Sequence, residues 1–129
     1  MVDPLHEIAY GGIARMEHEL LVRDFLELMS VKECGALEPF LRDDVRYSAS
    51  TGSQLVGRPA VVEMCREIID TFAVFGVDLV RISSVDNAVL VEERVLVAIE
   101  PGGEPQHLMG FAVFEIVDMQ IAVWRQLHG

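Results

Sequence analysis

The segment from Leu90 to Ile99 is apolar except for three adjacent charged residues, of which Glu92 and Arg94 lie two positions apart. If the segment is a strand, both face the same way as Leu96 and Ala98, because successive side chains of a strand alternate between its faces. A guanidinium stays protonated in proteins, so a buried arginine needs a carboxylate, a phosphate or a polar ligand beside it. Two interpretations stay open: Arg94 forms an internal ion pair with Glu92, or it binds a ligand in a pocket.

Polar side chains near the end of the chain could take part in the same chemistry. His128 follows Trp124 by four residues in an alternating segment, so the two should share a face. Its imidazole is a candidate acid or base, and a frayed, exposed histidine is the simpler alternative. Gln126, between them, can hydrogen-bond but cannot take up a proton. Tyr47 could donate a hydrogen bond into the same space, although tyrosine is also an ordinary strand residue.

The sequence lacks the motifs of metal, cofactor and nucleophile sites. The four histidines (His6, His18, His107 and His128) have no metal-ligand spacing, and no HExxH occurs. There is also no GxGxxG, no GxxxxGK and no GxSxG. We therefore expect neither a metal nor an organic cofactor.

Charge and composition limit the partners. The chain has 21 acidic residues against 10 lysines and arginines, for a net charge of −11, and Lys32 is its one lysine. Such a surface repels phosphate backbones and anionic lipids, so we expect no nucleic-acid and no membrane partner. Cys34 and Cys65 have no CxxC spacing, which favours reduced thiols. With no signal-peptide pattern and no run of about 18 apolar residues, we expect a cytoplasmic protein.

Hydrophobic periodicity predicts helices that precede a sheet. Residues 1–15 are weakly patterned and Tyr10-Gly11-Gly12 should break a helix, so we predict an N-terminal arm followed by a single domain over residues 16–129. The expected helices span residues 16–31, Cys34–Leu41 and Pro59 to about Ala73. The expected strands are Val45–Ser50, after a loop at Asp43-Asp44, then Val77–Val85 and three strands between Val89 and His128, with turns at Pro101–Pro105 and Asp118-Met119. This order predicts an α+β fold with a curved antiparallel or mixed sheet.

Alternation divides the last three strands into two faces. One is apolar with a few polar groups in mid-strand, as in a ligand cavity: Leu90, Glu92, Arg94, Leu96, Ala98, Leu108, Gly110, Ala112, Ala122, Trp124, Gln126 and His128. The other is almost wholly apolar in the strand centres: Val91, Glu93, Val95, Val97, Ile99, Met109, Phe111, Val113, Ile121, Val123, Arg125 and Leu127. So large an apolar face exceeds what a soluble monomer tolerates, so we expect a homodimer through it.

The element order resembles the limonene-1,2-epoxide hydrolase family, as does the pattern Tyr47…Gly57-Arg58…Glu93-Arg94-Val95…Val113-Phe114…Trp124-Arg125. The resemblance runs from about Glu19 to Gly129. It implies the nuclear-transport-factor-like, or SnoaL-like, cone fold, in which about three N-terminal helices close a strongly curved sheet around an apolar pocket. It also implies a dimer and a pocket lined by Leu26, Met29, Ile68, Phe72, Leu96, Ala98, Leu108 and Trp124.

In that family an aspartate–arginine–aspartate set, with a tyrosine and an asparagine, activates the water that opens the epoxide. The resemblance places the arginine at Arg94 and the tyrosine at Tyr47. The two aspartate positions hold Leu96 and Gln126, and the asparagine position holds Ala49. Because acid or base catalysis contributes roughly 10²–10⁴-fold for each role, we do not expect hydrolysis by the family route.

We therefore predict a protein that binds a small hydrophobic molecule, with an acidic or oxygenated end held by Arg94, Tyr47 and Gln126. The alternatives are a hydrolase or isomerase that uses Glu92 or His128, and a non-catalytic dimerising scaffold.

Overall fold

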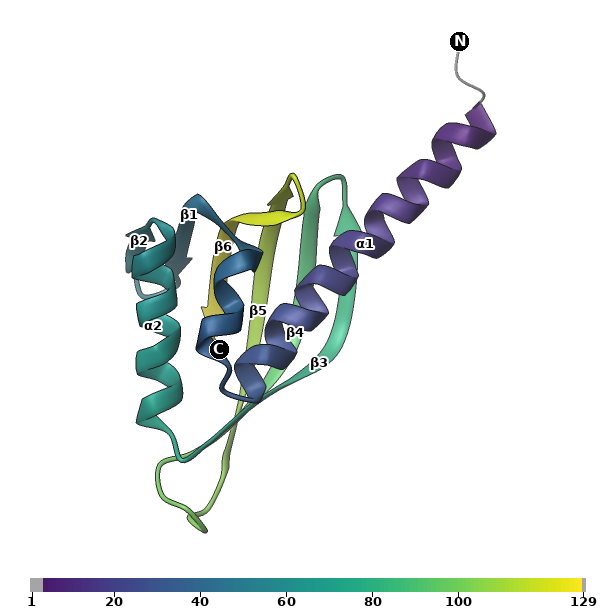
Figure 1. Ribbon diagram of the computed structural model, residues 1–129. Helices are drawn as coiled ribbons and strands as arrows, with labels where there is room; N and C mark the ends of the chain where they lie inside the picture. Colours follow the sequence, from purple (N-terminus) through teal and green to yellow (C-terminus); the bar gives the residue numbers. More distant parts are fainter. Residues whose placement is uncertain (1–3, 129) are drawn as a thin grey trace.

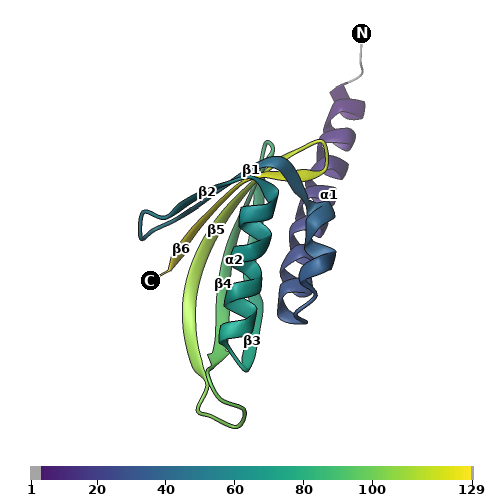
Figure 2. The ribbon, with the colours of Figure 1, turned by 60° about the vertical axis from the view of Figure 1, so that its left-hand side comes forward.

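The protein, described here over residues 4–128 by a computed structural model, packs its helices on one face of a curved six-stranded sheet (Figures 1 and 2). The elements are α1 (Pro4–Ser30), the 3₁₀ helix η1 (Cys34–Phe40), β1 (Leu41–Ala49), β2 (Gln54–Val56), α2 (Arg58–Thr71), β3 (Val74–Val85), β4 (Ala88–Ala98), β5 (Gln106–Val117) and β6 (Gln120–His128). The strand order is β2-β1-β6-β5-β4-β3, and β1 runs parallel to β6 while the other pairs are antiparallel. The predicted α+β fold with a mixed sheet is confirmed.

Helix α1 is longer than the sequence predicts. It begins at Pro4 and continues through Gly11 and Gly12, so the prediction of a non-helical arm is wrong for residues 4–15, and residues 1–3 lie outside the described part. Glycine lowers helix stability by about 0.5–1 kcal/mol relative to alanine, which weakens a helix without ending it. The N-terminal part of α1 projects past the edge of the sheet (Figure 1).

The C-terminal end of α1 is fastened to both of its neighbours. Ser30 Oγ donates to the carbonyl of Leu26 (3.1 Å) and accepts from the backbone N–H of Val77 in β3 (2.9 Å). Lys32 Nζ donates to the carbonyls of Phe72 (2.9 Å) and Ala73 (3.2 Å), just beyond α2. These bonds fix α1 against β3 and the end of α2, the elements that frame the interior.

The segment between α1 and α2 follows the prediction with one correction. The short helix η1 contains Pro39, and Pro59 lies in the first turn of α2, both as expected. Strand β1 begins at Leu41, so Asp43 and Asp44 belong to the strand rather than to a loop. Both are exposed, and Asp43 forms an ion pair with Arg58 at 2.7 Å.

Strand β4 presents the opposite face from the one predicted. Glu93 lies opposite Gly110 and Val95 opposite Leu108, and directly opposed residues of an antiparallel pair share a face. The buried side of β4 therefore consists of Val89, Val91, Glu93, Val95 and Val97. The prediction that Glu92, Arg94 and Leu96 share a face with Leu108 is wrong, because a shift of one residue moves every side chain of a strand to its other face.

Candidate functional site

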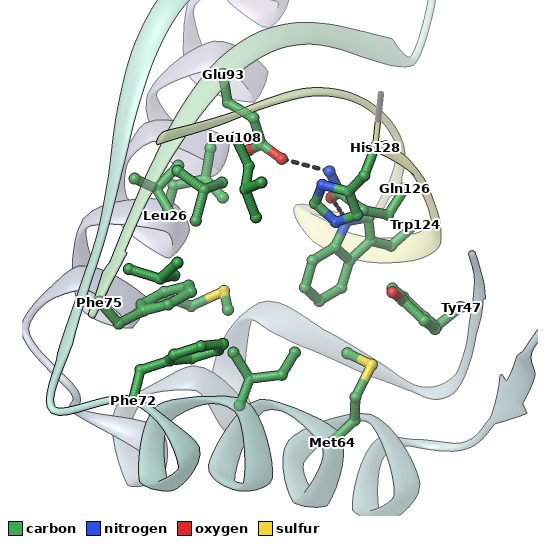
Figure 3. Close-up of a pocket in the computed structure, with 15 residues that line it drawn as sticks. Leu26, Tyr47, Met64, Phe72, Phe75, Glu93, Leu108, Trp124, Gln126 and His128 are labelled. Carbon is green, nitrogen blue, oxygen red and sulfur yellow. Dashed lines mark hydrogen bonds between the residues drawn. The ribbon is translucent and has the colours of Figure 1, made fainter. Parts of the chain in front are cut away.

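A cavity of about 180 Å³ lies between the two α-helices and the inner face of the sheet (Figure 3). Its walls are mainly apolar, and its lining residues are Leu26, Met29, Tyr47, Met64, Ile68, Phe72, Phe75, Val77, Glu93, Val95, Val97, Leu108, Trp124, Gln126 and His128. An apolar protein cavity of about 150 Å³ holds a benzene molecule, so this space suits a single-ring ligand.

Most of the predicted site residues lie around this cavity. They are Leu26, Met29, Tyr47, Ile68, Phe72, Leu108, Trp124, Gln126 and His128. The others, all on β4, lie outside it. Ala98 is buried at the end of the strand and Leu96 is half-buried on the outer side.

Arg94 and Glu92 do not form the internal ion pair, which is one of the two interpretations that the sequence leaves open. Arg94 is exposed on the outer face of the sheet, and Glu92 lies 3.8 Å from the guanidinium of the exposed Arg81. An acidic ligand in the cavity therefore cannot meet Arg94, which corrects the ligand-binding role predicted for it.

The carboxylate in the cavity is Glu93, which the sequence interpretation assigned to the outer face. Its residue is only 3% exposed. The sequence held a signal for it: the face with Val91, Val95 and Val97 carries one charged residue, whereas the alternate face of β4 carries Glu92 and Arg94. The face with fewer charges and more β-branched residues is the one suited to burial.

Glu93 receives a hydrogen bond from a fixed amide. Gln126 Nε2 donates to Glu93 Oε1, and Trp124 Nε1 donates to Gln126 Oε1 at 3.0 Å (Figure 3). Burial raises the pKa of the Glu93 carboxyl, while the bond from Gln126 and the charge of His128 act to lower it. A carboxyl with a raised pKa in an apolar pocket can serve as an acid or a base.

Gly110 of β5 leaves the space in which these polar groups meet. It lies opposite Glu93 on one side and opposite His128 on the other. A Cβ at this position would lie 3.1 Å from Glu93 Oε1, 3.2 Å from Gln126 Nε2 and 3.2 Å from His128 Nδ1. The three groups therefore converge over bare backbone, and the exposed His128 connects the cluster with solvent.

Aromatic rings form the wall beside this cluster. Trp124 meets Tyr47 edge-on with ring centroids 5.0 Å apart, stacks on Phe114 at 5.5 Å and meets Phe25 edge-on at 5.4 Å. The hydroxyl of Tyr47 points toward the cavity (Figure 3). Burial raises the pKa of Tyr47, as do the neighbouring Cys65 and Glu93, so its phenol stays protonated and can donate.

The sequence of this chain matches a known protein family. A sequence model described as the SnoaL-like domain matches residues 22–124. The chain belongs to the SnoaL-like family. The fold predicted from the resemblance is thereby confirmed.

Solved structures share this SnoaL-like fold. An LEH-like epoxide hydrolase of M. tuberculosis superposes with a TM-score of 0.79 at 24% identity, covering 89% of this chain and 84% of that one. A putative polyketide cyclase of Xanthomonas campestris pv. campestris gives 0.77 at 23% identity, covering 90% and 93%. A putative ketosteroid isomerase of Kribbella flavida DSM 17836 gives 0.77 at 16% identity, covering 89% and 79%. At these identities the likeness shows the fold, and no protein with a curated description matches the sequence.

Two further features concern the part of this SnoaL-like chain that the structure describes. Over residues 4–128, no group of three or more histidine, cysteine, aspartate or glutamate side chains is arranged to hold a metal ion. Within the same residues, no helix combines the length and the apolar character that crossing a bilayer requires.

Proposed function

We propose that this SnoaL-like protein binds a small, neutral, hydrophobic molecule in its cavity and transfers a proton on it, with Glu93 as the acid or base. The observation that carries the proposal is the buried carboxyl of Glu93 in an otherwise apolar space. General acid–base groups are tuned by such burial, because their pKa must lie near the working pH.

The geometry supports proton abstraction beside a carbonyl group. Ionised Glu93 takes a proton from the carbon next to the carbonyl, and the C–H electron pair moves to form an enolate. Tyr47 enters the cavity from β1 and can donate a hydrogen bond to the oxygen on which the charge develops. A donor placed at that oxygen stabilises the transition state. Where a carbon–carbon double bond adjoins the deprotonated carbon, the enolate extends over it, and return of the proton from Glu93 to the far carbon of that bond completes an isomerisation with no further reactant.

The cavity supports a neutral ligand rather than an anionic one. Among the described residues that line it, none is a lysine or an arginine, and Glu93 is the one carboxylate. An anion would lose its hydration there and be repelled by ionised Glu93. The acidic ligand considered from the sequence depended on Arg94, which lies on the other side of the sheet.

Proton exchange measured by NMR tests this proposal. Cyclohexanone and cyclohex-2-enone are incubated with the protein in D₂O, and the loss of the proton signals beside the carbonyl is followed. Glu93→Gln should slow the protein-dependent exchange by about 10²–10⁴-fold. Glu92→Gln is the matched control, because it removes the same charge one residue away on the opposite face.

Two results would contradict the proposal. Equal exchange by the Glu93→Gln and Glu92→Gln proteins would exclude Glu93 as the base. Exchange no faster than in buffer, together with no thermal stabilisation by single-ring ketones, would exclude both the reaction and the ligand class.

A further inference from the structure

The amide of Gln126 can face Glu93 with either of its ends, and the two arrangements differ chemically. The NH₂ group donates to an ionised carboxylate, whereas the carbonyl oxygen repels one and accepts a bond only from the protonated acid. The two ends are similar in shape, so packing alone does not choose between them. The choice must come from another hydrogen-bonding group.

Trp124 is that group. An indole N–H can only donate, so the amide atom 3.0 Å from Trp124 Nε1 must be the oxygen of Gln126. The NH₂ group is then left facing Glu93 Oε1 and, at 3.5 Å, the carbonyl oxygen of Phe111, and it donates to both. The indole itself is held by the rings of Tyr47, Phe114 and Phe25 and is 4% exposed, so its N–H has a fixed direction.

We propose that Trp124 and Gln126 are positioning residues for Glu93: the indole N–H orients the Gln126 amide, which holds one carboxylate oxygen and leaves the other for the ligand. The assignment of Glu93 as the reacting group rests on the proposed function. The orientation itself rests only on the hydrogen bonds.

This arrangement favours the ionised carboxylate, the form that acts as a base. Burial opposes ionisation of Glu93, and the Gln126 donor offsets part of that effect. The other titratable groups that face this region are His128 from β6 and Tyr47 from β1, with Cys65 of α2 behind Tyr47. The neighbouring parts of α1 and β3 contribute apolar side chains, including Leu26 and Val77. Removal of the donor should therefore keep Glu93 protonated to a higher pH.

The test measures the protonation of Glu93 directly, by the infrared band of its protonated carboxyl as a function of pH, identified by its loss in Glu93→Gln. Gln126→Met keeps a side chain of similar length without the donor and should raise the pKa of Glu93. Trp124→Phe keeps an aromatic ring without the N–H, frees the amide to turn, and should raise the same pKa. Because hydrogen bonds to charged groups are strong, we expect a rise of about one to two pH units for Gln126→Met.

The double variant separates a positioning role from general packing. If the indole influences Glu93 by orienting Gln126, Trp124→Phe should add nothing to the change produced by Gln126→Met. Gln120→Met is the matched control: it removes another glutamine of β6, whose Nε2 donates to the carbonyls of Pro39 (3.2 Å) and Leu41 (3.3 Å), and should leave the pKa of Glu93 unchanged. An unchanged pKa in Trp124→Phe or in Gln126→Met, or additive effects in the double variant, would overturn the proposal.

A second measurement needs no change to the aromatic cluster. Trp124 is the protein's one tryptophan, so its indole N–H gives one NMR signal. This signal should shift with pH as Glu93 titrates, and the shift should vanish in Glu93→Gln. A signal that does not follow Glu93 would overturn the proposal even if the variants fail to fold. If Glu93 titrates as expected but no ketone exchanges protons, the proposed reaction fails while the positioning roles stand.

Discussion

At the scale of single residues, the burial of Glu93 should make the stability of the protein depend on pH. Its pKa is raised in the folded state, so folding favours the protonated carboxyl. Below the ordinary glutamate pKa of about 4.3 the group is protonated in both states and contributes nothing. As the pH rises from there through the raised pKa, the folded state retains the proton longer than the unfolded state, and stability is lost. Glu93→Gln removes this loss.

Urea unfolding at several pH values checks this prediction. The free energy of unfolding of Glu93→Gln should exceed that of the unchanged protein at neutral pH, and the difference should shrink toward acid pH. Glu92→Gln provides the comparison, since Glu92 is paired with the exposed Arg81. A difference that is independent of pH would show that ionisation of Glu93 carries no cost in the fold.

Some residues of the cavity could be predicted from the sequence and others could not. Alternation along the last strand predicted Trp124 and Gln126 for the cavity, and the family resemblance placed Tyr47 there. The pattern missed Glu93, because the sequence of β4 has apolar residues on both faces and the favoured interpretation was off by one residue. No property of Gln126 alone shows that its amide is oriented by Trp124, since that bond depends on the positions of three aromatic rings.

At the scale of the elements, the polar side chains of β4 and β6 can come together over β5 because Gly110 has no side chain there. In Gly110→Ala the new methyl group would lie within 3.1–3.2 Å of atoms of Glu93, Gln126 and His128, so at least one of them must move. Overpacking of this kind typically costs about 1–3 kcal/mol. We expect a lower free energy of unfolding by about that amount, and a changed titration of the Trp124 indole signal.

The control for this prediction is Gly76→Ala in β3, where a Cβ would meet nothing within 4 Å. The added methyl group should be neutral or slightly stabilising there, because alanine restricts the unfolded chain more than glycine does. Equal effects of the two substitutions on stability and on the indole titration would show that Gly110 is not required for the polar cluster.

The elements differ in how well their sequences define them. The last two strands were predicted with the correct faces except at Ile121, which is buried beside a register shift between β5 and β6. Tight turns at Gly102 and at Asp118-Met119 fix the ends of these strands. Helix α1 was predicted too short, since Gly11-Gly12 is a weak break that a long helix can absorb. In strand β4 both faces carry apolar and charged residues, so its sequence gives only a weak signal, and the pairing of Glu93 with Gly110 assigns its faces.

At the scale of the whole molecule, the outer face of the sheet is less apolar than the sequence predicts. Val91, Val95 and Val97 face the interior and Ile121 is buried, so these four do not belong to it. The large apolar side chains that remain exposed there include Leu90, Met109, Phe111 and Leu127. Phe111 lies directly opposite Leu127 and Arg94 opposite Met109, so apolar and charged groups alternate across the face.

A homodimer through this face stays a prediction. A two-fold axis brings a surface against its own copy, and a face that carries both Glu92 and Arg94 beside apolar residues can be complementary to itself. Light scattering should then give twice the chain mass of 14.4 kDa. Phe111→Glu would bury an unpaired charge at the centre of the interface and should weaken association by at least about 30-fold, the size of an interface hot spot. Met119→Glu changes an exposed apolar residue in the β5–β6 turn and should leave the dimer intact. A monomeric mass for the unchanged protein, or equal association of both variants, would exclude this face as the interface.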